Sequence, residues 1–265
     1  MSAARVDVAT TSRDGGTVAR LTIDNRAKLN TLDSALMRDI VAAVDALGRR
    51  DDLRALVVTG AGEKAFIGGA SINEMAELDP ASARAFITLV HETCDAFRRL
   101  PVPVIARIDG FALGAGLEVA VSCDLRIATS RAKFGMPEVR VGLPSVVEAA
   151  LIPQLIGFGR ARELLMLGET IDAATALRWG LGERVVAPEA LDMELDAVLT
   201  SLLAGGALAV RRQKALMQAW ERLPMDGAIA AGVDAFEATF TSDEPRRMLS
   251  AFVARKAATK RPAQT

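Results

Sequence analysis

The spacing of apolar and polar residues predicts alternating strands and helices over the first three quarters of the chain. Short alternating or continuously apolar runs predict strands at 17–24, 53–60, 102–109 and 124–130. Between them, apolar residues recur at helical spacing over 34–50, with Asp33 or Ser34 placed to cap that helix. Further helices are expected from near Ile72, around His91 and around Glu118. This order is typical of an α/β fold.

The pattern changes near residue 190, beyond which no strand is expected. The remaining sequence has helical spacing throughout, apart from the last few residues. We therefore predict an α/β core over residues 1–195, followed by a helical region over residues 196–265.

Charge and hydropathy restrict the class of protein. Lys and Arg total 32 and Asp and Glu total 33, which gives a formal charge of −1. A balance of this kind argues against nucleic acid or an anionic membrane as the main partner. The first sixteen residues have no apolar stretch of signal-peptide length, and no uninterrupted apolar run reaches the length of a membrane helix. A cytoplasmic location is therefore expected.

The sequence offers few nucleophiles and few metal ligands. Its only histidine is His91, and its two cysteines, Cys94 and Cys123, lie far apart in the sequence. The Cys and His spacings of zinc sites are missing, and both cysteines are interpreted as buried packing residues. The helix around His91 has one apolar stripe that leaves His91 off the buried face, so a surface histidine is expected. The stripe consists of Phe86, Leu89, Val90, Thr93, Phe97 and Leu100.

Two glycine-bearing loops each join a strand to the start of a helix. They are "AFIGGAS" (65–71) and "ALGAG" (112–116). Backbone N–H groups at a helix start have no intrahelical acceptor, and the helix dipole adds positive potential there. If the loops lie side by side, one N–H from each can stabilise a thioester enolate or a tetrahedral oxyanion.

Glu118 is a lone carboxylate within the apolar run 111–124, in the first turn of its expected helix. The helix dipole favours its charged form and the apolar surroundings oppose it, a combination that can bring its pKa into a useful range for proton transfer. Twenty residues later, Glu138 in "KFGMPEVRVG" is placed to face it across a pocket. Taken alone, each glutamate also fits an ordinary paired or capping residue.

Four segments resemble the crotonase superfamily, the enoyl-CoA hydratases and isomerases. They are "KAFIGGASINEM", "IDGFALGAGLEVAVSCDLRIAT", "AKFGMPEVRVGLP" and "SAFVARKA". The resemblance implies a spiral of strand–strand–helix turns, a C-terminal α-helical trimerisation region, and a trimer or hexamer. It implies hydration of a 2-enoyl-CoA thioester, with double-bond isomerisation or CoA-thioester hydrolysis as alternatives. Coenzyme A is then part of the substrate, and no metal or redox cofactor is expected.

The same resemblance implies roles for individual residues. Ala70 and Ala115 correspond to the two oxyanion-hole donors, and Ala115 replaces a family glycine while keeping its N–H. Glu118 and Glu138 correspond to the two catalytic glutamates of hydratases, whereas simple isomerases typically need only the second. Which glutamate draws the proton from water stays open.

Residues expected to contact substrate or CoA follow from the same resemblance. The cations among them equally fit solvated surface residues, and the phenylalanines fit ordinary helix packing better than a role at the CoA tunnel. Arg255 and Lys256 are expected to reach a neighbouring subunit. The set is Lys28, Ala70, Ile72, Gly116, Phe236, Phe252, Arg255 and Lys256.

The sequence departs from the family pattern at 143–151. Typical hydratases have "PGAGG" after the second glutamate, whereas this chain has Val146, Val147 and Glu148 in place of glycines. Glu148 is interpreted either as a third acid–base group or as a first-turn residue favoured by its helix dipole. Ser71 also stands where many relatives have aspartate. Both changes affect the expected substrate more than the reaction class.

Two other classes are less consistent with the sequence. A dinucleotide-binding fold would need a small residue where Val119 stands, and Glu118 would face the pyrophosphate. An RNA-binding scaffold would need a basic stripe, but helix 34–50 carries charges of both signs.

Overall fold

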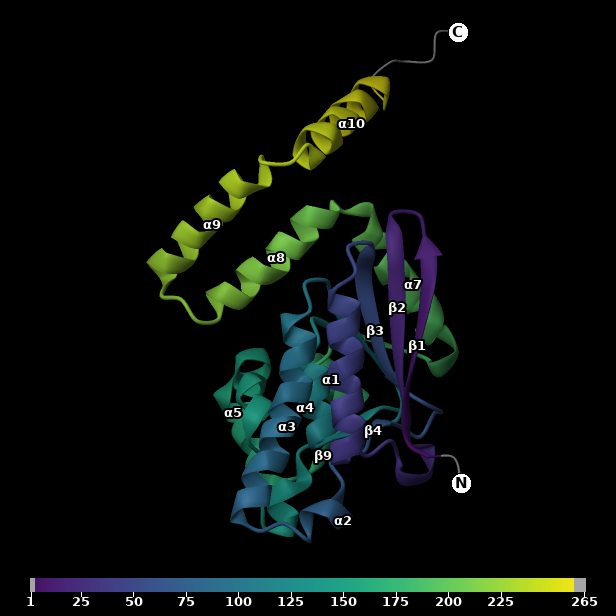
Figure 1. The fold of residues 1–265 in the computed structure, drawn as a ribbon, viewed down its shortest axis with the longest axis vertical. Coiled ribbons are helices and arrows are strands. Elements are labelled where there is room, and N and C mark those ends of the chain that lie inside the picture. Colours follow the sequence, from purple (N-terminus) through teal and green to yellow (C-terminus); the bar gives the residue numbers. More distant parts are fainter. Residues whose placement is uncertain (1–2, 260–265) are drawn as a thin grey trace. The chain divides into compact units, whose positions relative to one another are not determined.

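The computed structural model describes residues 3–259. The chain divides into two compact units, Met1–Thr200 and Ser201–Thr265, which are described separately below. The first unit holds all the described strands, and the second is helical (Figure 1).

The larger sheet of the first unit has six strands in the order β1-β2-β3-β5-β7-β10. Strands β1 and β2 pair antiparallel, and the other pairs are parallel. The strands are β1 Arg5–Arg13, β2 Gly16–Asp24, β3 Leu53–Gly60, β5 Val104–Ile108, β7 Leu125–Thr129 and β10 Arg184–Val186. Four of them confirm the strands expected from the sequence, whereas β1 was missed because it is largely exposed and polar.

A second sheet has four short strands in the order β4-β6-β8-β9. Strands β4, β6 and β8 are parallel, and β9 pairs antiparallel with β8. Their bounds are β4 Ala65–Ile67, β6 Phe111–Leu113, β8 Lys133–Gly135 and β9 Thr170–Asp172. The loop expected over 112–116 was wrong for 112–113, because these residues belong to β6.

Strands β3, β5 and β7 of the larger sheet are each followed by one strand of the smaller sheet and then by helical segments. This is the expected spiral of strand–strand–helix turns. The α-helices of this unit are α1 Ser34–Gly48, α2 Ile72–Met75, α3 Pro80–Arg99, α4 Ala115–Ser122, α5 Ile152–Leu167 and α6 Ala173–Trp179. The 3-10 helices are η1 Arg26–Lys28, η2 Pro137–Val141, η3 Val147–Leu151 and η4 Pro188–Ala190. Helix α7, Leu191–Ala204, continues past the end of the unit.

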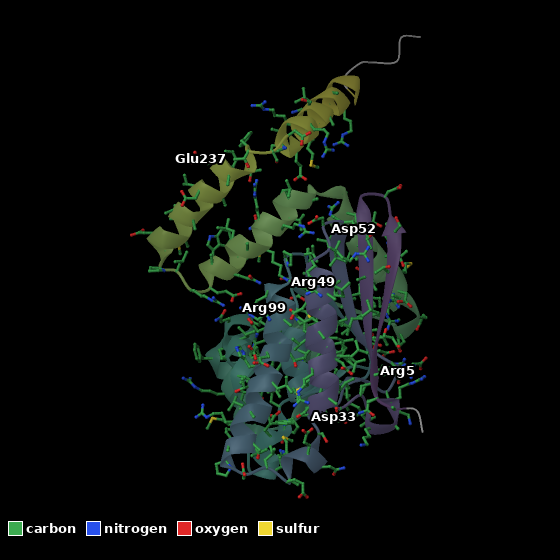
Figure 2. All side chains as sticks on the ribbon, viewed as in Figure 1. Arg5, Asp33, Arg49, Asp52, Arg99 and Glu237 are labelled. Atoms are coloured by element: carbon green, nitrogen blue, oxygen red, sulfur yellow. The ribbon has the colours of Figure 1, made fainter. Side chains whose placement is uncertain are left out.

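Helix α1 begins where the sequence predicted. The Asp33 carboxylate accepts a hydrogen bond from Leu36 N at 2.9 Å, which satisfies one of the free N–H groups of the first turn. Asp33 and Arg49 lie at the two ends of this helix (Figure 2), each with the charge that the helix dipole favours. Helix α3 packs beside α1 on one side and against α4 on another (Figure 1).

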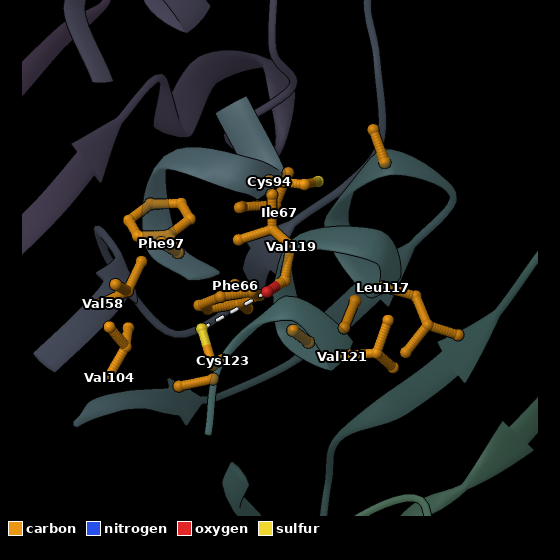
Figure 3. Close-up of a cluster of buried hydrophobic side chains, with 14 of the residues drawn as sticks. Val58, Phe66, Ile67, Cys94, Phe97, Val104, Leu117, Val119, Val121 and Cys123 are labelled. Carbon is orange, nitrogen blue, oxygen red and sulfur yellow. Dashed lines mark hydrogen bonds between the residues drawn. The ribbon is translucent and has the colours of Figure 1, made fainter. Parts of the chain in front are cut away.

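The hydrophobic core surrounds α4, so the helix that carries Glu118 is fixed on all sides. Phe66 and Phe97 are among its largest fully buried side chains (Figure 3). The expected apolar stripe of α3 is buried, and His91 is exposed, as predicted. The Cys94 and Cys123 side chains are buried within the core, and burial raises the pKa of Cys94. Both cysteines are therefore packing residues, as expected.

The second unit contains α8 Ala207–Trp220, α9 Met225–Thr239 and α10 Glu244–Thr259. Helix α8 packs against α9. The Glu244 carboxylate accepts hydrogen bonds from Leu208 N at 3.1 Å and Ala209 N at 3.0 Å, which ties α10 to the start of α8. Within residues 3–259, no single helix combines the length and apolar content of a membrane span, and one bent pair, Pro188–Ala204 with Ala207–Trp220, meets that test only when both halves are counted together.

Candidate active site

One cavity of the first unit brings together the two loops and the two glutamates singled out in the sequence. Its volume is about 290 Å³, and most of its lining is apolar. The lining residues are Gly68, Gly69, Ala70, Ile72, Met75, Phe86, Ile87, Val90, Gly114, Ala115, Glu118, Pro137, Glu138, Arg140, Val141, Leu143, Pro144 and Val146. Ala70, Ile72, Ala115, Glu118 and Glu138 are therefore all where the sequence predicted a site.

The smaller sheet explains this convergence. Strands β4, β6 and β8 are parallel, so their carboxyl ends meet at one edge. The chain leaves β4 toward Ala70, β6 toward Ala115, and β8 toward Glu138. Glu118 follows on α4, one turn after Ala115. Each of the three spiral turns thus contributes one part of the cavity wall.

The backbone of Ala70 is turned so that its N–H does not bond to the neighbouring segment. Leu32 N donates to Gly69 O at 2.9 Å, and Ser71 N donates to Leu32 O at 2.7 Å. Because successive N–H groups of an extended segment point to opposite sides, the Ala70 N–H points away from Leu32. Within residues 3–259 it has no hydrogen-bond acceptor, so it is free to bind a ligand oxygen.

The Ala115 N–H is the first of helix α4 and has no intrahelical acceptor. It follows Gly114, whose φ of +50° lies in the left-handed region that favours glycine. A Cβ added at Gly114 would collide with Glu138 Oε1 and would lie 3.9 Å from Gly69 Cα. The two loops are therefore side by side, and the Glu138 carboxyl group reaches between them.

Glu118 is 4% exposed, and its side-chain Oε1 accepts a hydrogen bond from Ala149 N at 3.2 Å. Burial raises its pKa to about 8; the negative charge of Glu138 adds to this rise, and the Ala149 hydrogen bond opposes it. The buried carboxyl group therefore holds a proton at neutral pH.

Glu138 is half-buried at the start of η2. Ser145 Oγ donates a hydrogen bond to its Oε2 at 2.8 Å, and Leu143 N donates to its carbonyl oxygen at 3.1 Å. These contacts fix the side chain and the turn that follows it. Two carboxyl groups in different surroundings on one cavity are a typical arrangement for acid–base chemistry.

The segment after Ser145 follows a strained path. Val147 has a φ of +40°, a left-handed conformation that costs a β-branched residue about 1–3 kcal/mol. The family glycine that the sequence replaces here would adopt this conformation without strain. Glu148 follows in the first turn of η3, as one of the two interpretations expected, but it is buried and lies 2.7 Å from His91 Nδ1.

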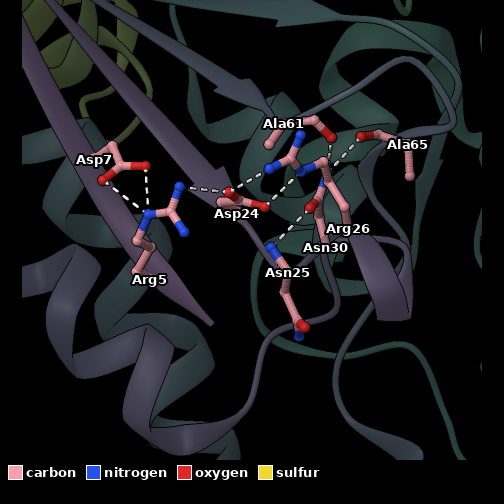
Figure 4. Close-up of polar contacts among 8 residues, drawn as sticks. All are labelled: Arg5, Asp7, Asp24, Asn25, Arg26, Asn30, Ala61 and Ala65. Atoms are coloured by element: carbon pink, nitrogen blue, oxygen red, sulfur yellow. Dashed lines mark hydrogen bonds and ion pairs between the residues drawn. The ribbon is translucent and has the colours of Figure 1, made fainter. Parts of the chain in front are cut away.

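A second hollow of about 370 Å³ lies beside the cavity and is partly cationic. Asn30 shapes it by donating to Ala61 O at 3.0 Å and Ala65 O at 2.8 Å (Figure 4). The lining residues are Arg26, Leu29, Asn30, Ala61, Gly62, Glu63, Lys64 and Ala65. Gly68 N donates to Leu29 O at 2.8 Å, so Leu29 borders the hollow while Gly68 borders the cavity.

Other residues expected at the site do not line the cavity. Lys28 is exposed on η1 beside the second hollow. Gly116 packs directly on the Ile67 carbonyl group, which leaves no room for a side chain. The other four predicted contacts belong to the second unit and stay predictions: Phe236, Phe252, Arg255 and Lys256.

Three residues that lie at the cavity or at the second hollow were not singled out from the sequence. Arg140 lines the cavity, Ser145 holds Glu138, and Lys64 lines the second hollow. The motifs "KAFIGG" and "PEVRVGLPS" contain all three, but their spacing alone gave no signal for a cation or a hydroxyl group.

Comparison with known proteins gives a consistent result over nearly the whole chain. Residues 13–260 match the family model described as enoyl-CoA hydratase/isomerase. A short-chain-enoyl-CoA hydratase of Clostridium acetobutylicum is 34% identical, and a crotonyl-CoA hydratase of Syntrophomonas wolfei is 36% identical; each match covers 91% of this chain and 93% of the relative. The crystal structure of an enoyl-CoA hydratase from Bacillus anthracis superposes with a TM-score of 0.89 at 28% identity, covering 94% of this chain and 96% of that one.

Proposed function

Because the chain belongs to the enoyl-CoA hydratase/isomerase family, we propose that it adds water to the double bond of a 2-enoyl-CoA thioester through Glu118 and Glu138. One observation carries the assignment of these residues. Two carboxyl groups and two backbone N–H groups without acceptors line one largely apolar cavity.

The proposed reaction is balanced without an external proton donor. The oxygen of water bonds to the β-carbon as a carboxylate takes one of its protons, and the electrons of the double bond move onto the thioester. The α-carbon then receives a proton from a carboxylic acid. We assign Glu118 as the acid, because burial keeps its proton at neutral pH, and Glu138 as the base. The reverse reaction exchanges these roles.

The Ala70 and Ala115 N–H groups would bind the thioester oxygen on which negative charge develops. Removal of one such donor typically lowers a rate by about a hundredfold or more. The addition of water involves no net oxidation or reduction, so the proposal includes no redox cofactor, and it includes no metal ion.

The lining of the cavity indicates the part of the substrate that it holds. Met75, Phe86, Ile87 and Val90 offer no polar groups, so we assign the apolar acyl chain to this wall. The phosphates of coenzyme A need cations, and Arg26 and Lys64 of the adjoining hollow supply them. Lys28 lies next to that hollow and remains a candidate.

The proposal also includes self-association as a trimer or hexamer through the helical C-terminal region, and a cytoplasmic location. The resemblance of the C-terminal segment "SAFVARKA" to the family supports self-association.

The test is hydration of crotonyl-CoA, measured as the decrease in absorbance of the conjugated enone. We expect Glu118→Gln and Glu138→Gln each to lower kcat by about a hundredfold or more, because each removes one proton-transfer group. Glutamine keeps the size of the side chain, so the cavity should stay intact.

Glu163→Gln, an exposed position on α5, is the matched control and should keep wild-type activity. Full activity in either cavity variant would contradict the paired assignment. Isomerase activity that survives Glu118→Gln while hydration is lost would favour the double-bond isomerase alternative.

A further inference from the structure

Glu148 is a buried carboxylate next to the cavity that the proposed reaction does not use. It is 7% exposed and does not line the cavity. Its Oε1 lies 2.7 Å from Nδ1 of His91, whose side chain is 51% exposed. Its Oε2 is buried and has no hydrogen-bond partner among residues 3–259. A carboxylate with only one such contact is costly to bury, so a role is needed to explain it.

The backbone connects Glu148 directly to Glu118. The peptide N–H of Ala149, the next residue, donates the hydrogen bond that Glu118 Oε1 accepts at 3.2 Å. The η3 turn therefore contacts α3 through the Glu148 side chain and α4 through the Ala149 N–H.

The backbone of the turn between these contacts is strained. Val147 precedes Glu148 with its φ at +40°, and Val146 lines the cavity. A strained turn keeps its shape only when contacts on either side hold it. The His91 contact is the one that ties η3 to the neighbouring helix α3 by a side-chain hydrogen bond.

Charged groups from two helices act on Glu148. Burial, helped by Asp95 of α3, raises the pKa of Glu148, while His91 and Arg98 of α3 favour its ionised form and limit this rise. From α4, Glu118 faces it, and the Glu148 charge in turn helps to raise the pKa of Glu118. The charged residues of α5, which continues from η3, are exposed.

We propose that His91 and Glu148 form a positioning pair for Glu118, in which the pair fixes η3 so that the Ala149 N–H and the Glu148 charge stay in place beside the Glu118 carboxyl group. Neither residue touches substrate. The inference rests on the proposed function only in taking Glu118 as the group that transfers the proton.

The first experiment compares His91→Leu with His91→Asn. An ionised Glu148 can only accept, so the hydrogen bond places the proton on His91 Nδ1, and the asparagine amide can replace that donor. We expect His91→Leu to lower kcat about tenfold with KM within about twofold, because substrate contacts are kept. His91→Asn should recover most of the loss. Glu92→Gln, an exposed neighbour on α3, is the control.

An unchanged kcat in His91→Leu, or a loss that appears only in KM, would overturn the proposal. Thermal unfolding of each variant separates lost positioning from lost folding. If His91→Leu fails to fold, the conservative Glu148→Gln variant still decides, since glutamine can accept from His91 through its amide oxygen while losing the charge.

For Glu148→Gln the readout is the pKa of Glu118 itself, measured by NMR on protein with ¹³C-labelled glutamate side chains. Removing a negative charge beside Glu118 favours its ionised form, so this pKa should fall, and the alkaline limb of kcat should move to lower pH. An unmoved Glu118 pKa would refute the pairing. The NMR titration needs no substrate, so it remains informative even if wild-type protein fails to hydrate crotonyl-CoA, the result that would refute the proposed function.

Discussion

Burial of Glu118 costs stability at alkaline pH, but it also gives the carboxyl group a pKa suited to proton transfer. Burial raises its pKa from the model-peptide value of 4.5 to about 8, so between these pH values the folded chain holds a proton that the unfolded chain releases. The contribution of Glu118 to stability is fully present below pH 4.5 and is lost as pH rises through about 8. Stability and the proposed hydration therefore both depend on the protonated form of this carboxyl group.

We expect Glu118→Gln to unfold at a higher temperature than wild type at pH 9, with a smaller difference at pH 5. Glutamine has no charge to bury, so the variant lacks the alkaline loss. Differential scanning calorimetry at the two pH values measures the effect, with Glu163→Gln as control. A difference that is equal at both pH values would contradict the raised pKa.

The same pKa shapes the activity of the wild-type protein. With Glu118 as the acid in hydration, kcat/KM for crotonyl-CoA should decline above about pH 8, where the group loses its proton. A flat profile from pH 7 to pH 9.5 would exclude Glu118 as that acid.

The backbone conformation of Gly114 leaves space for the Glu138 carboxyl group. Gly114→Ala would strain a φ of +50° and push Glu138 Oε1 out of place. We expect a loss of kcat of about a hundredfold, because displacements near 1 Å at reacting groups have such effects. Gly159→Ala, where an added Cβ meets nothing within 4 Å, should keep full activity. Wild-type kcat in Gly114→Ala would show that the Glu138 position does not matter.

At the residue scale, the sequence predicted the groups that share local motifs. Glu118 and Glu138 each stand in a recognisable context of glycine, proline and apolar residues. The pairing of His91 with Glu148 could not be predicted, because 57 residues separate them and only the packing of α3 against η3 brings them together. The prediction of an exposed His91 was confirmed, but exposure alone gave no hint of its partner.

At the element scale, long periodic segments were predicted well and short ones were not. Strands β4, β6 and β8 have three residues each, too few to show alternation, so β4 and β6 were expected to be loops and β8 was not predicted. These three strands nevertheless place Ala70, Ala115 and Glu138. These residues therefore line one cavity, while the sheet edge that joins them became visible only in the fold.

Helix α1 offers a test at this scale. Asp33→Ala removes the side chain that caps Leu36 N, and we expect a loss of about 1 kcal/mol in the free energy of unfolding. Asp33→Asn keeps an acceptor at the same place and should lose much less. Urea unfolding of the two variants measures the difference, and equal losses would show that the cap contributes little.

At the scale of the whole molecule, helix α9 of the second unit has a stripe of exposed apolar side chains. Ile229, Val233 and Phe236 recur at helical spacing along α9 and are 61%, 63% and 69% exposed. Exposed apolar stripes of this kind are typical of protein–protein contacts. The stripe fits the predicted role of the C-terminal helices in self-association.

We expect the double variant Ile229→Glu with Val233→Glu to sediment as a smaller species than wild type, because two charges would be buried in the contact. Glu237→Gln, on the same helix, serves as the control. A wild-type chain that sediments as a monomer, or a double variant that sediments unchanged, would contradict the assignment.

The convergence of three spiral turns at one sheet edge also bears on how such a protein acquires its activity as it folds. Each turn can form its own strands and helices early, but the cavity exists only once turns that are distant in sequence have stacked in register. Helical content is thus a poor guide to assembly of the cavity, since a partly assembled chain can have its helices formed while Glu118 and the Ala70 and Ala115 N–H groups are still apart.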